Sequence, residues 1–136
     1  MQIIQAGLQD AARLALLNKR LIEDERSDNP MCVAELESRM LDFLRGEYHA
    51  YLFSEGGETV GYALVRHTST PLYLRQFYID RDFRRRHYGQ TAFRLLMERL
   101  QADVIDIDVL PWNEAGRLFW KSCGFQETCV SMRRKA

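Results

Sequence analysis

Three consecutive arginines, Arg84, Arg85 and Arg86, lie between an apolar run and a segment with helical periodicity. The apolar run, Leu72 to Ile79, is rich in the aliphatic and aromatic residues typical of a β-strand. The first turn of a helix has unpaired backbone N–H groups and carries the positive end of the helix dipole, so it binds anions. A strand, a basic loop and a helix start in this order therefore predict a phosphate-binding site.

The basic segment resembles the pyrophosphate-binding loop of the GNAT acetyltransferases, Arg/Gln-x-x-Gly-x-Gly/Ala. Arg84 stands at the first position of this motif and Gly89 at the last, but His87 stands where the first glycine is expected. The resemblance implies that main-chain N–H groups from Arg84 to Gly89 hold the pyrophosphate of acetyl-CoA. Arg85 and Arg86 are expected to add charge-assisted contacts to the phosphates.

A second segment, Asn113 to Phe125, resembles the closing motif of the same family, Asn-x-x-Ala-x-x-φ-Tyr-x-x-φ-Gly-Phe, in which φ is apolar. Trp120 takes the usual tyrosine position. The two motifs stand in the order typical of the family, separated by one expected helix and one expected strand. A pair of motifs in this order is more specific than a basic loop alone.

In this family acetyl-CoA lies in a V-shaped gap between two splayed strands, and its pantetheine arm pairs with exposed main chain. The resemblance implies that Phe77, Tyr78 and Ile79 supply that main chain, and that a backbone N–H near Ile79 polarises the thioester carbonyl. Asn113 is expected to cap its helix and to contact the pantetheine arm. The complete set of expected cofactor-binding residues is Phe77, Tyr78, Ile79, Arg84, Arg85, Arg86, His87, Tyr88, Gly89, Gln90, Asn113 and Trp120.

His87 departs from the family pattern, and glycine permits backbone conformations and a close ligand approach that a side chain resists. One interpretation is that this position is already helical, so that His87 fits and its imidazole faces solvent or a phosphate. The other is that His87 weakens coenzyme A binding or shifts the cofactor. We favour the helical interpretation because Gly89 remains at the second glycine position.

Acetylation of an amine requires a neutral nitrogen, so a base or a water chain must remove a proton from the alkylammonium ion. Asp108 is the expected base, because it aligns with an acidic residue that some family members use on this strand. Alternation from Val104 to Leu110 places Asp106 on the same side of the strand. The alternative is that both aspartates face solvent without a catalytic role.

Trp120 replaces the tyrosine that is thought to protonate the departing thiolate of coenzyme A in this family. Loss of a general acid commonly costs about 10²- to 10⁴-fold in rate rather than all activity. Tyr78, Tyr88 and, less readily, Cys123 could donate the proton instead. Each of them could equally be a packed aromatic ring or a buried thiol, and Trp120 itself is expected to form a wall of the cofactor cleft.

The segment from Leu21 to Asn29 connects the first two expected helices, where members of the family largely select their acceptors. Its four acidic residues could attract a cationic amine, and they are Glu23, Asp24, Glu25 and Asp28. A solvated surface turn would explain the same composition. The sequence leaves the acceptor open among small amines, amino acids, polyamines, antibiotics and protein termini.

Hydrophobic periodicity gives the element order β-α-α-β-β-β-α-β-α-β. This order matches the GNAT fold, an α/β (α+β) architecture in which a mostly antiparallel mixed sheet is flanked by about four helices. The expected strands include Ile3 and Ile4, and cover Ala50–Ser54, Thr59–Arg66, Leu72–Ile79, Val104–Leu110 and Phe125–Met132. The expected helices run from a cap at Asp10 into the polar run from Glu23, from after Pro30 to Gly46, from about Arg86 to Gln101, and from Asn113 to Gly124.

A length of 136 residues predicts a single domain, residues 1–136. Nineteen basic residues balance nineteen acidic ones, which argues against binding of nucleic acid. Three cysteines without paired spacing, and the lack of a secretory signal or a long apolar run, predict a cytoplasmic protein that needs no disulfide, metal or membrane. Because members of the family are often dimers, a homodimer is one expected state.

The expected function is N-acetylation of a primary amine by direct transfer from acetyl-CoA. The alternative is a non-catalytic acyl-CoA-binding or regulatory module, which His87 and Trp120 would favour. Binding of RNA or DNA through the three arginines is a third alternative, and the balanced net charge disfavours it.

Overall fold

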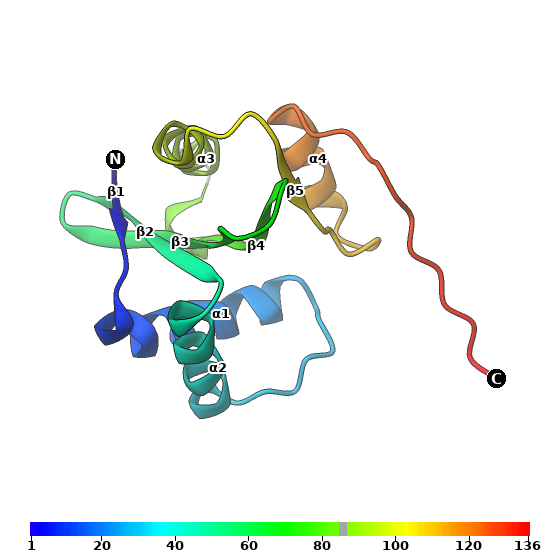
Figure 1. Ribbon diagram of the computed structural model, residues 1–136, viewed down its shortest axis with the longest axis horizontal. Coiled ribbons are helices and arrows are strands. Elements are labelled where there is room, and N and C mark those ends of the chain that lie inside the picture. Colours follow the sequence, from blue (N-terminus) through cyan, green and yellow to red (C-terminus); the bar gives the residue numbers. More distant parts are fainter. Residues whose placement is uncertain (85–86) are drawn as a thin grey trace.

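A five-stranded sheet forms the centre of the structure, a computed structural model that describes residues 1–84 and 87–136 (Figure 1). The strands lie side by side in chain order: β1 (Gln2–Gln5), β2 (Tyr48–Glu55), β3 (Glu58–Arg66), β4 (Leu72–Ile79) and β5 (Ile105–Ile107). Each neighbouring pair is antiparallel except β4 and β5, which are parallel. The mostly antiparallel mixed sheet expected from the sequence is confirmed.

Helices cover both faces of the sheet (Figure 1). On one face lie α1 (Ala11–Asp24), which follows the short 3-10 helix η1 (Leu8–Asp10), and α2 (Val33–Arg45). On the other face lie α3 (Tyr88–Leu100) and α4 (Glu114–Ser122), and a second 3-10 helix, η2 (Arg81–Phe83), follows β4. The expected start of the third helix at about Arg86 falls outside the described residues, and the described helix begins at Tyr88.

Alternation along the two central strands divides the core into two halves. One half packs with α1 and α2 and includes the strand residues Ala50, Leu52, Tyr62 and Leu64. The other half packs with α3 and includes their neighbours Tyr51, Phe53, Ala63 and Val65. All of these side chains are at most 6% exposed, so the centre of the sheet is a rigid support for β4 at its side.

The signals for turns and helix ends are mostly confirmed. Gly56 and Gly57 form the turn between β2 and β3 with φ of 58° and 84°, which glycine adopts without strain. Gly46 ends α2. Asp10 stands at the N-cap position of α1, but its carboxylate accepts a 2.9 Å hydrogen bond from the Gly7 N–H instead of capping that helix.

The strand expected over Phe125–Met132 is wrong. Residues 125–136 form no helix or strand in the described part of the chain, and they run away from the body of the protein (Figure 1). Glu127 forms ion pairs with two cations of α4, Arg117 at 2.6 Å and Lys121 at 3.6 Å. These pairs hold the start of the segment against α4, so it does not pair with the edge of β5.

The parallel strands β4 and β5 run together over only a short distance. β5 pairs with Leu72 to Leu74, and it is shorter than the expected strand Val104–Leu110. Beyond Leu74, β4 continues to Ile79 without a strand on that side, while its other side stays paired with β3. Pairing between the two strands therefore ends well before the end of β4, as a V-shaped gap between them would require.

Candidate active site

A cleft of about 500 Å³ lies between the end of β4 and the starts of α3 and α4. It is lined by every described residue that the sequence assigned to cofactor binding: Phe77, Tyr78, Ile79, Arg84, His87, Tyr88, Gly89, Gln90, Asn113 and Trp120. Arg85 and Arg86, which belong to the same set, lie outside the described residues. The fold thus brings two motifs that are separate in the sequence to one cavity.

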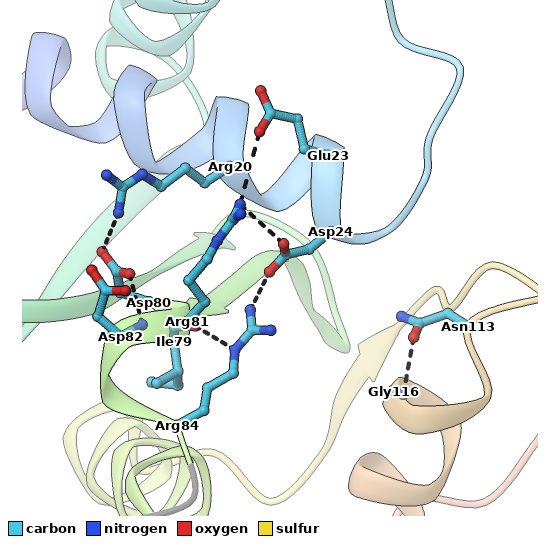
Figure 2. A network of polar contacts seen from close by, with 10 residues as sticks. All are labelled: Arg20, Glu23, Asp24, Ile79, Asp80, Arg81, Asp82, Arg84, Asn113 and Gly116. Carbon is cyan, nitrogen blue, oxygen red and sulfur yellow. Dashed lines mark hydrogen bonds and ion pairs between the residues drawn. The ribbon is translucent and has the colours of Figure 1, made fainter.

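The end of β4 contributes main chain to the cleft. Phe77, Tyr78 and Ile79 pair with β3 along one edge, and along the edge beyond β5 no strand from residues 1–84 or 87–136 pairs with them. The Ile79 carbonyl accepts a 3.0 Å hydrogen bond from Arg84 Nε (Figure 2). An extended ligand can pair with a strand edge of this kind as an added strand does.

The first turn of α3 reaches the cleft through Tyr88 and Gly89. A Cβ atom at Gly89 would lie only 3.0 Å from Phe119 Cε1 of α4, so a larger residue here would have to displace the Phe119 ring by a few tenths of an ångström. The N–H groups of a first helical turn have no intrahelical partners and attract anions. The position of Gly89 in the cleft therefore fits the pyrophosphate site expected from the sequence.

His87 has a left-handed backbone conformation, with φ 58° and ψ 20°, directly before α3. The interpretation that this position is already helical is therefore wrong. The left-handed conformation costs a residue other than glycine about 1–2 kcal/mol. The position where the family has glycine is thus strained in this chain, and the exposed His87 side chain lines the cleft.

An acidic residue at the end of α1 engages the arginines that follow β4 (Figure 2). Asp24 forms ion pairs with Arg81 at 3.2 Å and with Arg84. Beside them, Arg20 of α1 and the nearly buried Asp80 form a pair at 2.6 Å. The side chain of Arg84 is therefore shared between Asp24 and the end of β4.

Glu23 also lies near this network, 3.8 Å from Arg81. Of the four acidic residues that could attract a cationic acceptor, Glu23 and Asp24 already face cations (Figure 2). The hypothesis of an acidic attraction for the acceptor consequently depends on Glu25 and Asp28.

Glu25 lines both the cleft and a smaller polar cavity beside it. Burial raises the pKa of the Glu25 carboxyl above its ordinary value of 4.5, and the charge of Asp24 raises this pKa further. A carboxylate with a raised pKa at a cleft is suited to accept a proton. The sequence alone identified Glu25 only as one member of an acidic run.

Trp112 connects the segment before α4 to the end of α1. Its indole Nε1–H donates a 3.0 Å hydrogen bond to the Glu25 carbonyl, and Arg26 Nη2 donates one of 3.3 Å to the Trp112 carbonyl. These bonds join positions 86 and 87 residues apart in the chain. They hold the main chain of Glu25 next to the cleft, and no pattern in the sequence indicated them.

Asp108, the base expected from the sequence, is exposed and follows the end of β5. The described residues that line the two cavities do not include it. Tyr73 of β4 lines the polar cavity and donates a hydrogen bond to Asp108. Asp106, whose Cα pairs with that of Tyr73, is exposed as well. Asp108 thus reaches the cavities through Tyr73 or through water.

Trp120 lines the cleft within a cluster of aromatic rings. Its ring centroid lies 5.0 Å from that of Phe77, 5.3 Å from Phe93 and 4.8 Å from Phe119, with the ring planes near perpendicular. Edge-to-face pairs of this kind contribute about 0.5–1.5 kcal/mol each beyond buried area. Trp120 therefore joins β4, α3 and α4, and it has no acidic hydroxyl for a leaving thiolate.

Three residues could supply that proton instead of a tyrosine at position 120. Tyr78 and Tyr88 line the cleft, and Cys123 does not. Burial raises the pKa of the Cys123 thiol, which packs in the core beside Trp120. The hydroxyl of Tyr78 is buried without a hydrogen-bond partner among residues 1–84 and 87–136, so Tyr78 and Tyr88 are the two candidates that remain at the cleft.

Asn113 caps α4 as expected. Its side-chain Oδ1 accepts a 3.0 Å hydrogen bond from the Gly116 N–H (Figure 2). Because this bond uses the oxygen, the amide nitrogen of the Asn113 side chain remains as a donor at the cleft.

Other kinds of site were sought in the described part of the chain. There, no three His, Cys, Asp or Glu side chains are grouped so that they could hold a metal ion. The helices of residues 1–84 and 87–136 all lack the length and apolar character needed to cross a membrane.

Solved structures of acetyltransferases share this fold over nearly their whole length. A possible acetyltransferase from Clostridium difficile 630 has a TM-score of 0.81 and 14% identity, covering 99% of this chain and 96% of that one. A ribosomal-protein-alanine N-acetyltransferase from Brucella melitensis biovar Abortus 2308 has a TM-score of 0.75 and 14% identity, covering 99% of both chains. An aminoglycoside N-acetyltransferase in complex with CoA has a TM-score of 0.73 and 18% identity, covering 98% of this chain and 93% of that one.

These identities establish the fold alone, and a search of curated proteins found no significant match. The sequence itself matches the family model described as the acetyltransferase (GNAT) family over residues 15–125. That range contains the cleft residues of β4, α3 and α4. The chain therefore belongs to the acetyltransferase (GNAT) family.

Proposed function

We propose that this protein transfers the acetyl group of acetyl-CoA to a primary amine. The observation that carries the proposal is the cleft at which the open edge of β4, the first turn of α3 and the cap of α4 meet. A strand edge suits an extended arm that contains amides, and a helix start suits a pyrophosphate. The aminoglycoside N-acetyltransferase with a similar fold, whose structure contains CoA, supports the same ligand.

The cleft residues fit acetyl-CoA in three parts. Main chain from Phe77 to Ile79 would pair with the pantetheine arm, and Asn113 would donate to it from α4. The start of α3 at Gly89 would hold the pyrophosphate. Arg85 and Arg86, which lie outside the described residues, would add positive charge as the sequence motif implies. Acetyl-CoA supplies an activated thioester, and a main-chain N–H near Ile79 would polarise its carbonyl.

The acceptor starts as an alkylammonium ion, so it loses two protons while the C–N bond forms and the C–S bond of the thioester breaks. One proton is passed to the leaving sulfur, and the other goes to a base. We assign this proton to Glu25, which lines the cleft and has a raised pKa. Asp108, the base proposed from the sequence, is the alternative to Glu25, and it would act through Tyr73 or water. Tyr78 would give a proton to the leaving sulfur.

A second candidate function is a non-catalytic module that binds acyl-CoA. The observation that favours it is Trp120, which packs among aromatic rings where a proton-donating tyrosine is usual in the family. Calorimetric titration with acetyl-CoA followed by a thiol-release assay over a panel of amines separates the two functions. Binding with amine-dependent release of thiol supports transfer, binding without release from any amine supports the module, and absence of binding contradicts both.

A further inference from the structure

A second cavity, of about 230 Å³, lies beside the cofactor cleft and shares Leu21 and Glu25 with it. Its lining is formed by the end of α1 and the segment after it, by Arg39 of α2 and by Tyr73, Arg75 and Gln76 of β4. The cavity is thus positioned to hold a second, smaller substrate next to the cleft.

Two guanidinium groups dominate the charge of this cavity. Arg39 and Arg75 both lie on the ring of Phe43, at 5.3 Å and 4.9 Å from its centroid. In residues 1–84 and 87–136 neither guanidinium forms an ion pair with a carboxylate, in contrast to Arg20 and Arg81 on the other side of α1. Burial and the charge of Arg75 both lower the pKa of Arg39, as expected for a positive charge that lacks a counterion.

The Nε–H of Arg39 is buried and has no hydrogen-bond partner among the described residues. Buried polar groups are normally paired, so a donor of this kind points to a missing acceptor. An anionic group that binds the guanidinium of Arg39 in the cavity would neutralise the excess charge. Arginine binds carboxylates in a bidentate manner, which gives both strength and orientation.

A buried hydrogen-bond chain supports the floor of the cavity. Asn18 Oδ1 accepts hydrogen bonds from Arg39 Nη2 at 3.1 Å and from Gln76 Nε2 at 3.4 Å. Gln76 Oε1 in turn accepts one of 2.8 Å from the Tyr62 hydroxyl. Asn18 and Gln76 are 1% and 8% exposed, so the chain is fixed by its surroundings. The bond from Arg39 Nη2 to Asn18 holds the guanidinium in place, and neither amide oxygen brings a negative charge that would neutralise it.

Glu25 supplies the opposite charge at the boundary between the two cavities. A ligand that places a carboxylate at the arginines would therefore meet a negative side chain on the way to the cofactor cleft. This arrangement of charges matches a molecule that carries both a carboxylate and an amine.

We propose that the acceptor is a free amino acid, whose carboxylate binds Arg39 and Arg75 and whose amine faces Glu25 at the cofactor cleft. This inference rests on the proposed acetyl transfer, and it names the class of acceptor. This proposal differs from the hypothesis that acidic residues attract a cationic amine, because here the protein recognises the carboxylate of the acceptor.

The experiment compares amino acids with the amines that lack only the carboxylate: leucine with 3-methylbutylamine, phenylalanine with phenethylamine and tyrosine with tyramine. Thiol release from acetyl-CoA gives kcat and KM for each pair, and calorimetry on the complex with coenzyme A gives the affinity of each amine independently of turnover. For at least one pair we expect the amino acid to have the higher kcat/KM and the tighter binding by about ten- to a hundredfold, as for loss of a charged hydrogen bond.

Arg39→Met and Arg75→Met retain the aliphatic length of the side chain and remove its charge. Each should raise KM for the amino acid by about tenfold or more, while KM for the paired amine and the Kd for acetyl-CoA stay unchanged. Arg94→Met, on the exposed face of α3, is the matched control and should change none of these values. An unchanged Kd for acetyl-CoA also reports that a variant is folded.

Equal kcat/KM and equal affinity within every pair would overturn the inference and leave the proposed acetyl transfer standing. The inference would also be overturned if Arg39→Met and Arg75→Met raised KM equally for the amino acid and for its paired amine. Tight binding of an amino acid without any release of thiol would support the site and contradict acetyl transfer. Failure to bind acetyl-CoA would contradict the proposed function itself.

Discussion

The hydroxyl of Tyr73 donates a 2.7 Å hydrogen bond to the carboxylate of Asp108. Burial and this bond to an anion raise the pKa of Tyr73, so the hydroxyl stays protonated at neutral pH and the contact persists. The bond ties the side chain after β5 to a side chain that lines the polar cavity. Asp108 therefore has two possible roles. It is either a direct base or a positioning residue that acts through Tyr73.

Comparison of Asp108→Asn with Tyr73→Phe distinguishes these roles. If Asp108 positions Tyr73, both substitutions should raise KM for the acceptor by a similar factor, about tenfold or less, with little change in kcat. A direct base would instead lower kcat by about 10²- to 10⁴-fold in Asp108→Asn and leave Tyr73→Phe nearly active. Steady-state kinetics with saturating acetyl-CoA measures both values.

Glu25→Gln should lower kcat by about 10²- to 10⁴-fold, because glutamine cannot accept the amine proton. In the parent protein the rate should fall as pH decreases through the raised pKa of Glu25, above 4.5, because protonation removes the base. The acid limb of the pH–rate profile should disappear in the variant. Glu23→Gln, on the same helix and exposed, is the control and should keep the limb. A Glu25→Gln variant with the parent rate would exclude Glu25 as the base.

The same raised pKa predicts how stability depends on pH. The folded state binds the Glu25 proton more tightly than the unfolded chain, so this contribution to stability is full below the unfolded pKa. It is lost as pH rises through the folded pKa. Glu25→Gln should therefore gain stability relative to the parent protein between pH 4 and pH 7. Urea unfolding at both pH values measures the difference, and a constant difference would contradict the raised pKa.

Substitution of His87 by glycine should relieve the left-handed strain before α3. The strain of about 1–2 kcal/mol exceeds the entropic cost of a glycine, about 0.5–1 kcal/mol, so the free energy of unfolding should rise by about 0.5–1 kcal/mol. His87→Ala removes the imidazole and retains the strain, so it should not gain this stability. Affinity for acetyl-CoA should stay equal or increase in His87→Gly, and a similar loss of affinity in both variants would mean that the imidazole binds the cofactor.

Asp24→Asn should strengthen binding of acetyl-CoA, because Asp24 pairs with Arg81 and Arg84 beside the expected phosphate site. Removal of one half-buried charge at this range changes affinity by about three- to tenfold at low ionic strength, and salt screens the effect. Calorimetry in about 20 mM and about 500 mM salt measures the affinity of both proteins for acetyl-CoA. The affinities of the variant and the parent protein should converge at the higher salt concentration. Asp103→Asn, an exposed position after α3, is the control. Weaker binding in Asp24→Asn would mean that the pair holds the loop in its binding conformation.

Trp112→Phe should remove the hydrogen bond to the Glu25 carbonyl while an aromatic ring stays in place. A single exposed bond contributes about 0.5–1 kcal/mol, so the loss of stability should be small. The larger effect should be a higher KM for the acceptor, because the main chain of Glu25 loses its support. Acceptor kinetics and denaturant unfolding measured on the same sample separate the two effects.

The sequence predicted the parts of the site that depend on local pattern. Gly89 and Asn113 lie at helix starts that composition and periodicity indicate, and both line the cleft. The contacts of Trp112 and Arg39 could not be predicted in this way, because each depends on an element far away in the chain. The expected strand over Phe125–Met132 failed for the same reason: a segment can be compatible with a strand, but it forms one only where a neighbouring edge pairs with it.

The open edge of β4 has a consequence for how this protein tolerates change. The edge offers only main chain, and the side chains of this strand pack into the core on both faces. Phe77 packs with Phe93 and Trp120 in one half of the core, and Tyr78 packs with Tyr62 in the other. Replacements that keep their volume should leave ligand pairing intact. A single inserted residue in β4 would be far more damaging, because it reverses which face every later side chain occupies. Variants of this protein should therefore tolerate substitutions in β4 better than insertions or deletions, because the spacing of residues along the strand fixes the face that each side chain occupies.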